Sequence, residues 1–176
     1  MAHKQQFDFV QFVANLYPSN FKNAKVLEVG SLDINGSVRQ FFTDCDYIGI
    51  DLGEGKGVDV VCEGQEYDAP ANSFDTTISC ECFEHNPEWL LTFVNMYRMT
   101  KPGGLIIMSC ATTGRPEHGT RRTTPHDAPF CGDYYKNLTE QDFREKLNID
   151  KMFSAYEFAI GHETKDLYFY GIKELL

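Results

Sequence analysis

The sequence predicts an α/β fold, a doubly wound and mostly parallel seven-stranded sheet that ends in an antiparallel hairpin. Short apolar runs of strand character alternate with helical segments along most of the chain, which is the pattern of a parallel sheet with crossover connections. The 176 residues suffice for one compact domain, and 42% of them are hydrophobic, so the chain can bury a core. We therefore expect a single domain over residues 1–176.

An amphipathic helix is expected first, within residues 1–24. Its apolar residues recur at helical spacing across residues 5–17: Phe9, Phe12, Val13 and Leu16. Pro18 ends this helix. The first ten residues contain no apolar stretch of the secretory type, so we expect a cytoplasmic protein with reduced thiols.

Seven short apolar runs are typical of strands. They lie at residues 25–29, 47–51, 58–61, 75–80, 105–110, 153–160 and 166–173. Buried parallel strands have this continuous rather than alternating pattern. The last two runs are joined by a short turn and predict the hairpin. The connections after the second and third strands are too short, or lack the periodicity, for the usual crossover helices, so we expect both to be trimmed.

Three further helices are predicted, together with one long loop. The helices are expected near residues 36–43, 86–99 and 140–147, and Thr139 to Asp142 has the pattern of a capping box for the last. Residues 111–137 lack periodicity, and a loop of this length in a compact domain is usually a lid or a binding loop.

The net charge disfavours two classes of partner, and the spacing of the cysteines disfavours a metal site. A net charge of −10 disfavours a broad surface for nucleic acid or anionic membrane, and no apolar run is long enough to cross a bilayer. Cys80 and Cys82 are separated by one residue, unlike a zinc knuckle. The set of His118, His126 and Cys131 has no recognisable metal-site spacing either, so we expect no metal.

The segment VLEVGSLDINGS (26–37) indicates a nucleotide-binding turn without phosphate contacts. It lacks Gly-x-Gly-x-x-Gly, because Leu32 and Asn35 stand at the second and third glycine positions, and no P-loop lysine follows. Glu28 would repel a phosphate but suits an ammonium group. Asp51 closes the second strand, where a carboxylate can accept bonds from ribose hydroxyls. An adenosine that carries an amine and no phosphate describes S-adenosylmethionine.

Four ordered segments resemble the motifs of class I S-adenosylmethionine-dependent methyltransferases, in particular methyltransferase type 11. They are VLEVGS (26–31), YIGIDL (47–52), NSFDTTISCECFEH (72–85) and MTKPGGLIIMSC (99–110). The resemblance implies a Rossmann-like sheet with an antiparallel last strand. It also implies S-adenosylmethionine as cofactor and methyl transfer as the reaction.

The resemblance further implies which residues hold the cofactor. Glu28 and the loop Gly30, Ser31 and Leu32 would hold the methionine part, and Asp51 the ribose. The family prefers glycines after Gly30, and a longer polar turn replaces them here.

On the adenine side, Leu52 would pack on the base. Glu63, Gly64 and Gln65 stand where the family usually has an acid facing the adenine amine, although Glu63 could equally be an ordinary surface acid. Cys80 would line the floor through its backbone.

The loop 111–137 is the candidate substrate loop because it leaves from a strand's carboxyl end, where ligands of such sheets sit. Arg115 and Arg121 predict an anionic acceptor, held by guanidinium groups. The alternative is that these arginines pair with the protein's own surplus carboxylates. If a general base is used, His118 is the first candidate and His126 the second. His85 could contact the substrate, or Glu84 and His85 could merely cap the next helix.

The leading hypothesis is a methyltransferase (EC 2.1.1.-) that acts on O or N of a small, anionic acceptor. Alignment of the acceptor contributes more than a base, since positioning lowers a barrier by roughly 7–11 kcal/mol. Two alternatives stay open: a non-catalytic module that binds the cofactor or a nucleoside, and a Rossmann-like enzyme of other chemistry. A homodimer over an exposed sheet face is also compatible with the sequence.

Overall fold

The computed structural model describes residues 3–175 and contains one seven-stranded sheet of order β3-β2-β1-β4-β5-β7-β6. The strands are β1 (Lys25–Val29), β2 (Asp46–Asp51), β3 (Val60–Val61), β4 (Phe74–Cys80), β5 (Thr100–Ala111), β6 (Phe153–Gly161) and β7 (Asp166–Lys173). Strands β1 to β5 are parallel, and β7 lies antiparallel between β5 and β6. The predicted doubly wound sheet with its antiparallel hairpin is confirmed.

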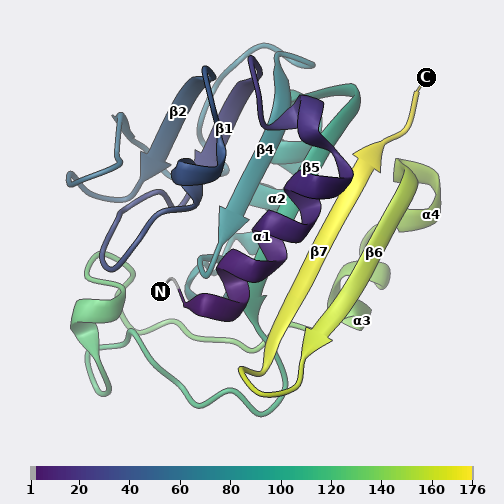
Figure 1. Cartoon of the computed structure of the whole chain (residues 1–176). Coiled ribbons are helices and arrows are strands. Elements are labelled where there is room, and N and C mark those ends of the chain that lie inside the picture. Colours follow the sequence, from purple (N-terminus) through teal and green to yellow (C-terminus); the bar gives the residue numbers. More distant parts are fainter. Residues whose placement is uncertain (1–2, 176) are drawn as a thin grey trace.

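Helices cover both faces of this sheet and divide the core into two layers. The α-helices are α1 (Lys4–Leu16), α2 (Trp89–Met99), α3 (Glu140–Arg144) and α4 (Ile149–Met152). The 3-10 turns are η1 (Pro18–Asn20), η2 (Val38–Phe41), η3 (Phe83–His85) and η4 (Pro125–Asp127). Helix α1 crosses the front of β4 and β5, whereas α2 lies behind them (Figure 1). Val10 and Val13 of α1 belong to one core layer, and Phe93 of α2 and Phe143 of α3 belong to the other.

On the β2 and β3 side of the sheet, the chain has less helix and strand than the sequence predicts. The helix expected at 36–43 is wrong: only η2 forms there, because the chain is already extended at Phe42 and Thr43 bonds to the segment before β1. The strand expected at 58–61 shrinks to two residues, which are 40% and 51% exposed. The trimmed crossovers are confirmed, since the described chain has no helix between β2 and β4.

Two helix boundaries also shift. Helix α2 begins at Trp89 rather than 86, because Asn86 to Glu88 form a turn in which Asn86 Oδ1 accepts the Glu88 N–H at 2.8 Å. The helix expected over 140–147 ends at Arg144, and α4 follows as a separate turn.

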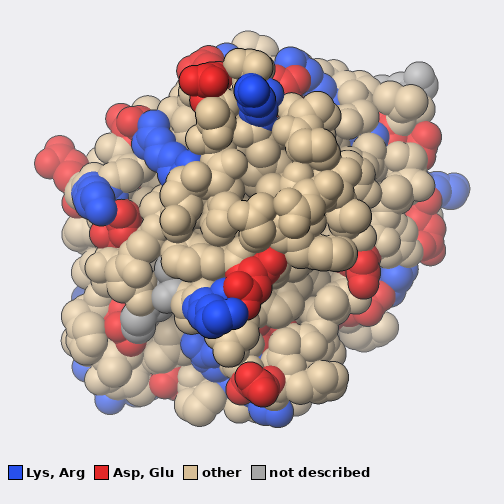
Figure 2. Space-filling model, viewed as in Figure 1, with Lys and Arg blue, Asp and Glu red and all other residues tan. Residues whose placement is uncertain are grey.

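The buried face of α1 is rotated from the predicted one. Gln6, Val10 and Val13 are its buried residues, whereas Phe12 and Leu16 are 49% and 47% exposed. The centre of the molecular face that carries α1 is free of charged side chains, and residues of both signs surround it (Figure 2). Within the described chain, no helix is both long and apolar enough for a membrane span.

The predicted capping box of α3 forms and supports a first prediction. Thr139 Oγ1 accepts the Asp142 N–H at 3.3 Å, and Asp142 Oδ2 accepts the Thr139 N–H at 2.8 Å. Thr139→Ala should lower the free energy of unfolding by about 1 kcal/mol, the usual effect of losing an N-cap. Urea denaturation measures this, with Thr113→Ala at an exposed loop position as the control. Equal stabilities of the two variants would contradict the role of the cap.

Candidate functional site

A cavity of about 310 Å³ opens at the carboxyl ends of β1, β2 and β4. Its volume lies within the range of small-molecule sites. All ten residues that the sequence and the resemblance point to as cofactor ligands line it: Glu28, Gly30, Ser31, Leu32, Asp51, Leu52, Glu63, Gly64, Gln65 and Cys80. Residues from four separate segments of the chain therefore meet in one place.

Asp51 lies at the end of β2 and organises the turn after β1. Its Oδ2 accepts the Leu32 N–H at 3.0 Å, and its Oδ1 accepts the Leu52 N–H at 2.7 Å. Burial raises the pKa of this carboxyl, while the backbone donors lower it. A carboxylate offers about four acceptor positions, so Asp51 retains capacity to accept further bonds from a ligand in the cavity.

Glu28 faces the same cavity from β1 but is more deeply buried, with 5% of the residue exposed. The Tyr47 hydroxyl donates to its Oε2 at 2.8 Å. Burial raises the pKa of Glu28 to about 8, against the smaller lowering effect of the Tyr47 bond. A cation in the cavity would favour the ionised form of Glu28.

The turn after β1 approaches its neighbours closely. Gly30 has φ +80°, and a Cβ there would lie 2.7 Å from Cys82 Cβ. The Gly30 and Ser31 N–H groups both donate to Ile50 O, at 2.9 and 3.1 Å. Ser31 Oγ is buried and has no hydrogen-bond partner among residues 3–175, so the turn presents a free hydroxyl at a residue that lines the cavity.

The Asp33 side chain stabilises this turn, in which the family's later glycines are absent. Its Oδ1 accepts the Gly36 N–H at 2.7 Å, and its Oδ2 lies 2.6 Å from Lys56 Nζ. The longer polar turn expected from the sequence is therefore held by a side chain rather than by glycine backbone.

The opposite side of the cavity combines the β3–β4 connection with the long loop. Gly64 O accepts from Asn95 Nδ2 of α2 at 2.9 Å, and Gln65 Oε1 accepts from Thr92 Oγ1 at 3.2 Å. The Phe130 ring packs on Gly53, where a Cβ would meet it at 2.4 Å. Phe130 also lines the cavity, a contact that the sequence did not reveal.

The arginines of the loop are largely paired within the protein. Arg115 donates to Thr164 O, and its Nη1 lies 3.3 Å from Asp166 Oδ1. Arg122 Nε lies 2.6 Å from Glu117 Oε1. The guanidinium of Arg121 is exposed and has no ion pair within the described part of the chain. Arg115 therefore pairs with one of the protein's own carboxylates, as the alternative interpretation expected. Arg121 is the loop arginine that stays available to an anion.

The two candidate bases do not line the cavity. The His126 side chain is 77% exposed, with its Nε2 3.3 Å from Asp127 Oδ1. His118 is 14% exposed in its side chain, and its Nδ1 lies 3.1 Å from Pro116 O. Burial lowers the pKa of His118.

His85 does line the cavity, and it is not a helix cap. It is 4% exposed, in η3, and α2 has no side-chain cap at all. Burial lowers the pKa of His85 to about 3, with a smaller contribution from His118, so the imidazole is neutral. Its ring makes an edge contact with His118, at 5.1 Å between centroids.

Several lining residues were missed by the sequence analysis. They include Gln6 of α1, Glu81 and Cys82 after β4, and the loop residues Asp127 to Cys131. Glu81 and Cys82 stand inside the ECFEH motif, whose position after a strand could have indicated them. Gln6 and the loop residues carry no local signal.

Comparison with known proteins identifies a related protein family. Residues 27–108 match the family model described as "Methyltransferase domain". No curated protein matches the sequence.

Two solved structures illustrate the likeness of the fold. Haemonchus contortus phosphoethanolamine N-methyltransferase 2, in complex with S-adenosyl-L-methionine, is 15% identical with a TM-score of 0.66, over 96% of this chain and 52% of that one. This chain thus spans about half the length of that enzyme. Burkholderia thailandensis 1,6-didemethyltoxoflavin-N1-methyltransferase, with bound 1,6-didemethyltoxoflavin and S-adenosylhomocysteine, is 15% identical with a TM-score of 0.62, over 99% and 92%. The matched domain, the strand order and these likenesses lead to one conclusion: residues 27–108, a little under half of the chain, match a methyltransferase domain, and the chain shares the fold of these S-adenosylmethionine-dependent methyltransferases.

Proposed function

We propose that this protein transfers a methyl group from S-adenosylmethionine to an oxygen or nitrogen of a small, anionic acceptor. The observation that carries the proposal is that Glu28 and Asp51, on neighbouring strands, line one cavity. Glu28 suits the ammonium of the methionine part and Asp51 the ribose hydroxyls. The Ser31 hydroxyl, which has no hydrogen-bond partner among the described residues, is a further donor for the same ligand.

The chain's own contribution is alignment and exclusion of water rather than proton transfer. The cofactor supplies the electrophilic methyl group. His85 is the imidazole that lines the cavity, and its pKa near 3 makes it a poor base at neutral pH. An acceptor that is already an anion, or an uncharged amine, needs no base. The two structural neighbours described above methylate nitrogen according to their names, which supports a small acceptor of this kind.

Titration calorimetry with S-adenosylmethionine, S-adenosylhomocysteine and NAD tests the cofactor. Both sulfur nucleosides should bind and NAD should not, because the turn lacks the glycines for a pyrophosphate. Binding of NAD alone would favour the alternative of other Rossmann-like chemistry. Binding of the sulfur nucleosides, with no methyl transfer to any of a panel of small carboxylates, phosphates and amines, would favour the non-catalytic module.

Arg121 provides a prediction that separates acceptor from cofactor. Arg121→Ala should leave the Kd for S-adenosylhomocysteine unchanged and reduce kcat/KM for the acceptor by about tenfold, the effect of losing one exposed charge-assisted contact. Lys146→Ala, at an exposed cation outside the loop, is the control for net charge. Equal loss of cofactor and acceptor binding in Arg121→Ala would contradict this division.

A further inference from the structure

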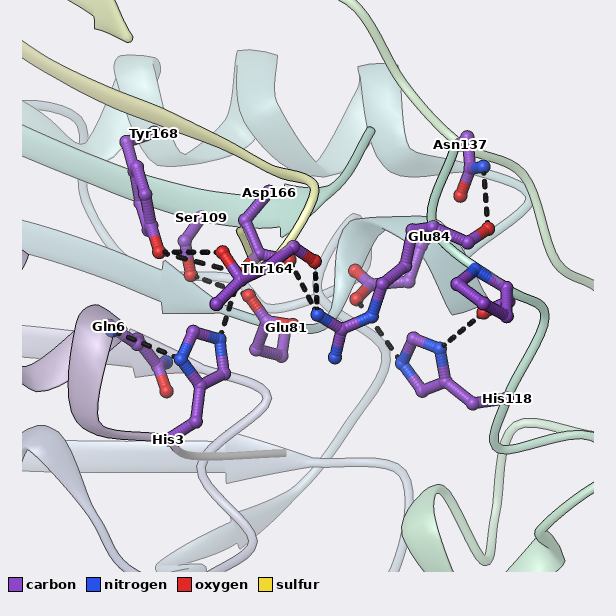
Figure 3. Close-up of polar contacts among 12 residues, drawn as sticks. His3, Gln6, Glu81, Glu84, Ser109, His118, Asn137, Thr164, Asp166 and Tyr168 are labelled. Carbon is purple, nitrogen blue, oxygen red and sulfur yellow. Dashed lines mark hydrogen bonds and ion pairs between the residues drawn. The ribbon is translucent and has the colours of Figure 1, made fainter. Parts of the chain in front are cut away.

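A buried group of three metal-ligating side chains lies beside the cofactor cavity. Glu84 and His85 come from η3, and His118 comes from the long loop. One ligand atom from each lies within 4.8 Å of the others. Figure 3 shows the Glu84 carboxylate and the His118 ring facing each other, with Glu84 Oε1 and His118 Nε2 3.9 Å apart.

Within residues 3–175, these polar atoms have no hydrogen-bond partner. Both carboxylate oxygens of Glu84, Nδ1 of His85 and Nε2 of His118 are buried without such a bond. Glu84 is fully buried and His85 is 4% exposed. An unpaired buried polar group costs roughly 1–3 kcal/mol, and more when it is charged. Four such atoms converging at one place call for a ligand that bonds to all three side chains.

The chemistry of the group matches a divalent cation. A neutral imidazole with a free ring nitrogen is the form of histidine that binds metals, and His85 Nδ1 and His118 Nε2 are such nitrogens. Two imidazoles and a carboxylate are a frequent protein ligand set of zinc and of other first-row ions. With metal bonds of about 2.0–2.2 Å, two ligand atoms lie about 3.4 Å apart in tetrahedral geometry and at most about 4.4 Å apart on opposite sides of the ion. The 3.9 Å between Glu84 and His118 falls inside this limit.

A glycine lets the loop approach closely enough to complete the group. Gly119 has φ +70°, and a Cβ there would lie 2.5 Å from His85 Cε1. The rings of His85 and His118 both contact Tyr135, at 5.5 and 5.1 Å between centroids, which fixes their positions.

A second group of similar composition, His3, Glu81 and Asp166, is largely paired, although Glu81 Oε2 has no hydrogen-bond partner among the described residues. His3 Nε2 lies 2.9 Å from Asp166 Oδ2, and Arg115 Nη1 lies 3.3 Å from Asp166 Oδ1. Glu81 Oε1 accepts from Ser109 Oγ at 3.0 Å. Figure 3 shows this network beside Glu84. Since Asp166 already has two cationic or hydrogen-bonding neighbours, this group leaves fewer free ligand atoms for a metal than Glu84, His85 and His118 do.

We propose that Glu84, His85 and His118 bind one divalent first-row transition ion, with Zn²⁺ preferred over Mn²⁺ and Mg²⁺. The spacing in the sequence predicted no metal, because the ligands come from segments that only the fold brings together. His85 belongs both to this group and to the cavity lining, so the ion would lie at the edge of the cavity. There its open coordination positions would hold an oxygen of the anionic acceptor, a role that rests on the proposed function.

Calorimetry on the full chain, freed of metal by chelation, tests the site. Zn²⁺ should bind with a stoichiometry of one, Mn²⁺ should bind more weakly, and Mg²⁺ should bind weakest. Glu84→Gln and His118→Asn should each lower the Zn²⁺ affinity by more than about 100-fold, beyond the effect of losing a group that only orients a ligand. His162→Ala, at an exposed turn histidine, should leave it unchanged. Unchanged affinity in both cluster variants would overturn the site.

Two further measurements keep the result independent of folding and of methyl transfer. Co²⁺ loaded into the protein should give visible absorption bands that His118→Asn removes, while the circular dichroism of the variant matches that of the unmodified protein. Persistence of the bands would overturn the assignment. S-adenosylhomocysteine binding is measured in the metal-free protein: its presence without Zn²⁺ binding refutes only the metal site, and its absence with Zn²⁺ binding refutes only the proposed function.

Discussion

Asp51→Asn should weaken S-adenosylhomocysteine binding roughly 100-fold. The asparagine keeps the size of the side chain, but its amide nitrogen cannot accept a bond from a backbone N–H or a ribose hydroxyl. One of the Leu32 and Leu52 donors at 3.0 and 2.7 Å loses its acceptor, and the ligand loses a charge-assisted bond. Bonds to charged groups contribute about 1.5–3 kcal/mol each, and 1.4 kcal/mol is tenfold in Kd.

Calorimetry measures the affinity, and Asp46→Asn is the matched control. Asp46 lies at the other end of β2 and its side chain is 70% exposed, so its substitution should not change the Kd. A thermal melt of each variant shows whether the turn after β1 still folds. An unchanged Kd in Asp51→Asn, with an unchanged melt, would remove Asp51 from the ribose-binding role.

The sheet and the cofactor side of the site could be predicted because their signals are local. Buried parallel strands are continuous apolar runs, and a ligand of such a sheet sits beyond their carboxyl ends. Placing Glu28 and Asp51 at the ends of two strands was therefore enough to bring them to one cavity. The helix expected at 36–43 does not form because Thr43 pairs with Lys22 and with the backbone of Phe21 and Asn23, contacts that have no local signal in the sequence.

The loop could not be predicted in the same way. Its contacts are made by side chains distant in sequence, such as the Phe130 ring on Gly53 or His118 against His85. Composition indicated a cationic loop, yet which arginine pairs internally depends on Asp166, which lies at the start of β7. For the same reason the Glu84, His85 and His118 group has no motif that spacing alone would reveal.

Glu28→Gln should stabilise the ligand-free protein at high pH and not at low pH. The pKa of Glu28 is raised from 4.5 to about 8 in the folded protein, so the folded state holds a proton that the unfolded chain releases above about pH 4.5. The stability that this proton provides is fully present below pH 4.5 and is lost as the pH rises through 8. At 1.36 kcal/mol per pKa unit, the loss has an upper limit of about 5 kcal/mol.

Glutamine keeps an acceptor for the Tyr47 hydroxyl but cannot ionise. Urea denaturation should therefore give a larger free energy of unfolding for Glu28→Gln than for the unmodified protein at pH 8.5, by a few kcal/mol, and nearly equal values at pH 5. Glu157→Gln is the control, because Glu157 also accepts a tyrosine hydroxyl at 2.8 Å but is exposed. The pKa of Glu84 is also raised by burial, so some pH dependence should survive in the variant.

The proton on Glu28 also couples cofactor binding to pH. If Glu28 accepts the ammonium of the methionine part, binding favours the ionised carboxylate, and the protein must release a proton near pH 7. Calorimetry with S-adenosylhomocysteine in buffers of different ionisation enthalpy counts that proton, and Glu28→Gln should abolish its release. A binding enthalpy that shifts equally with buffer in both proteins would place the ammonium elsewhere, because no other change distinguishes them.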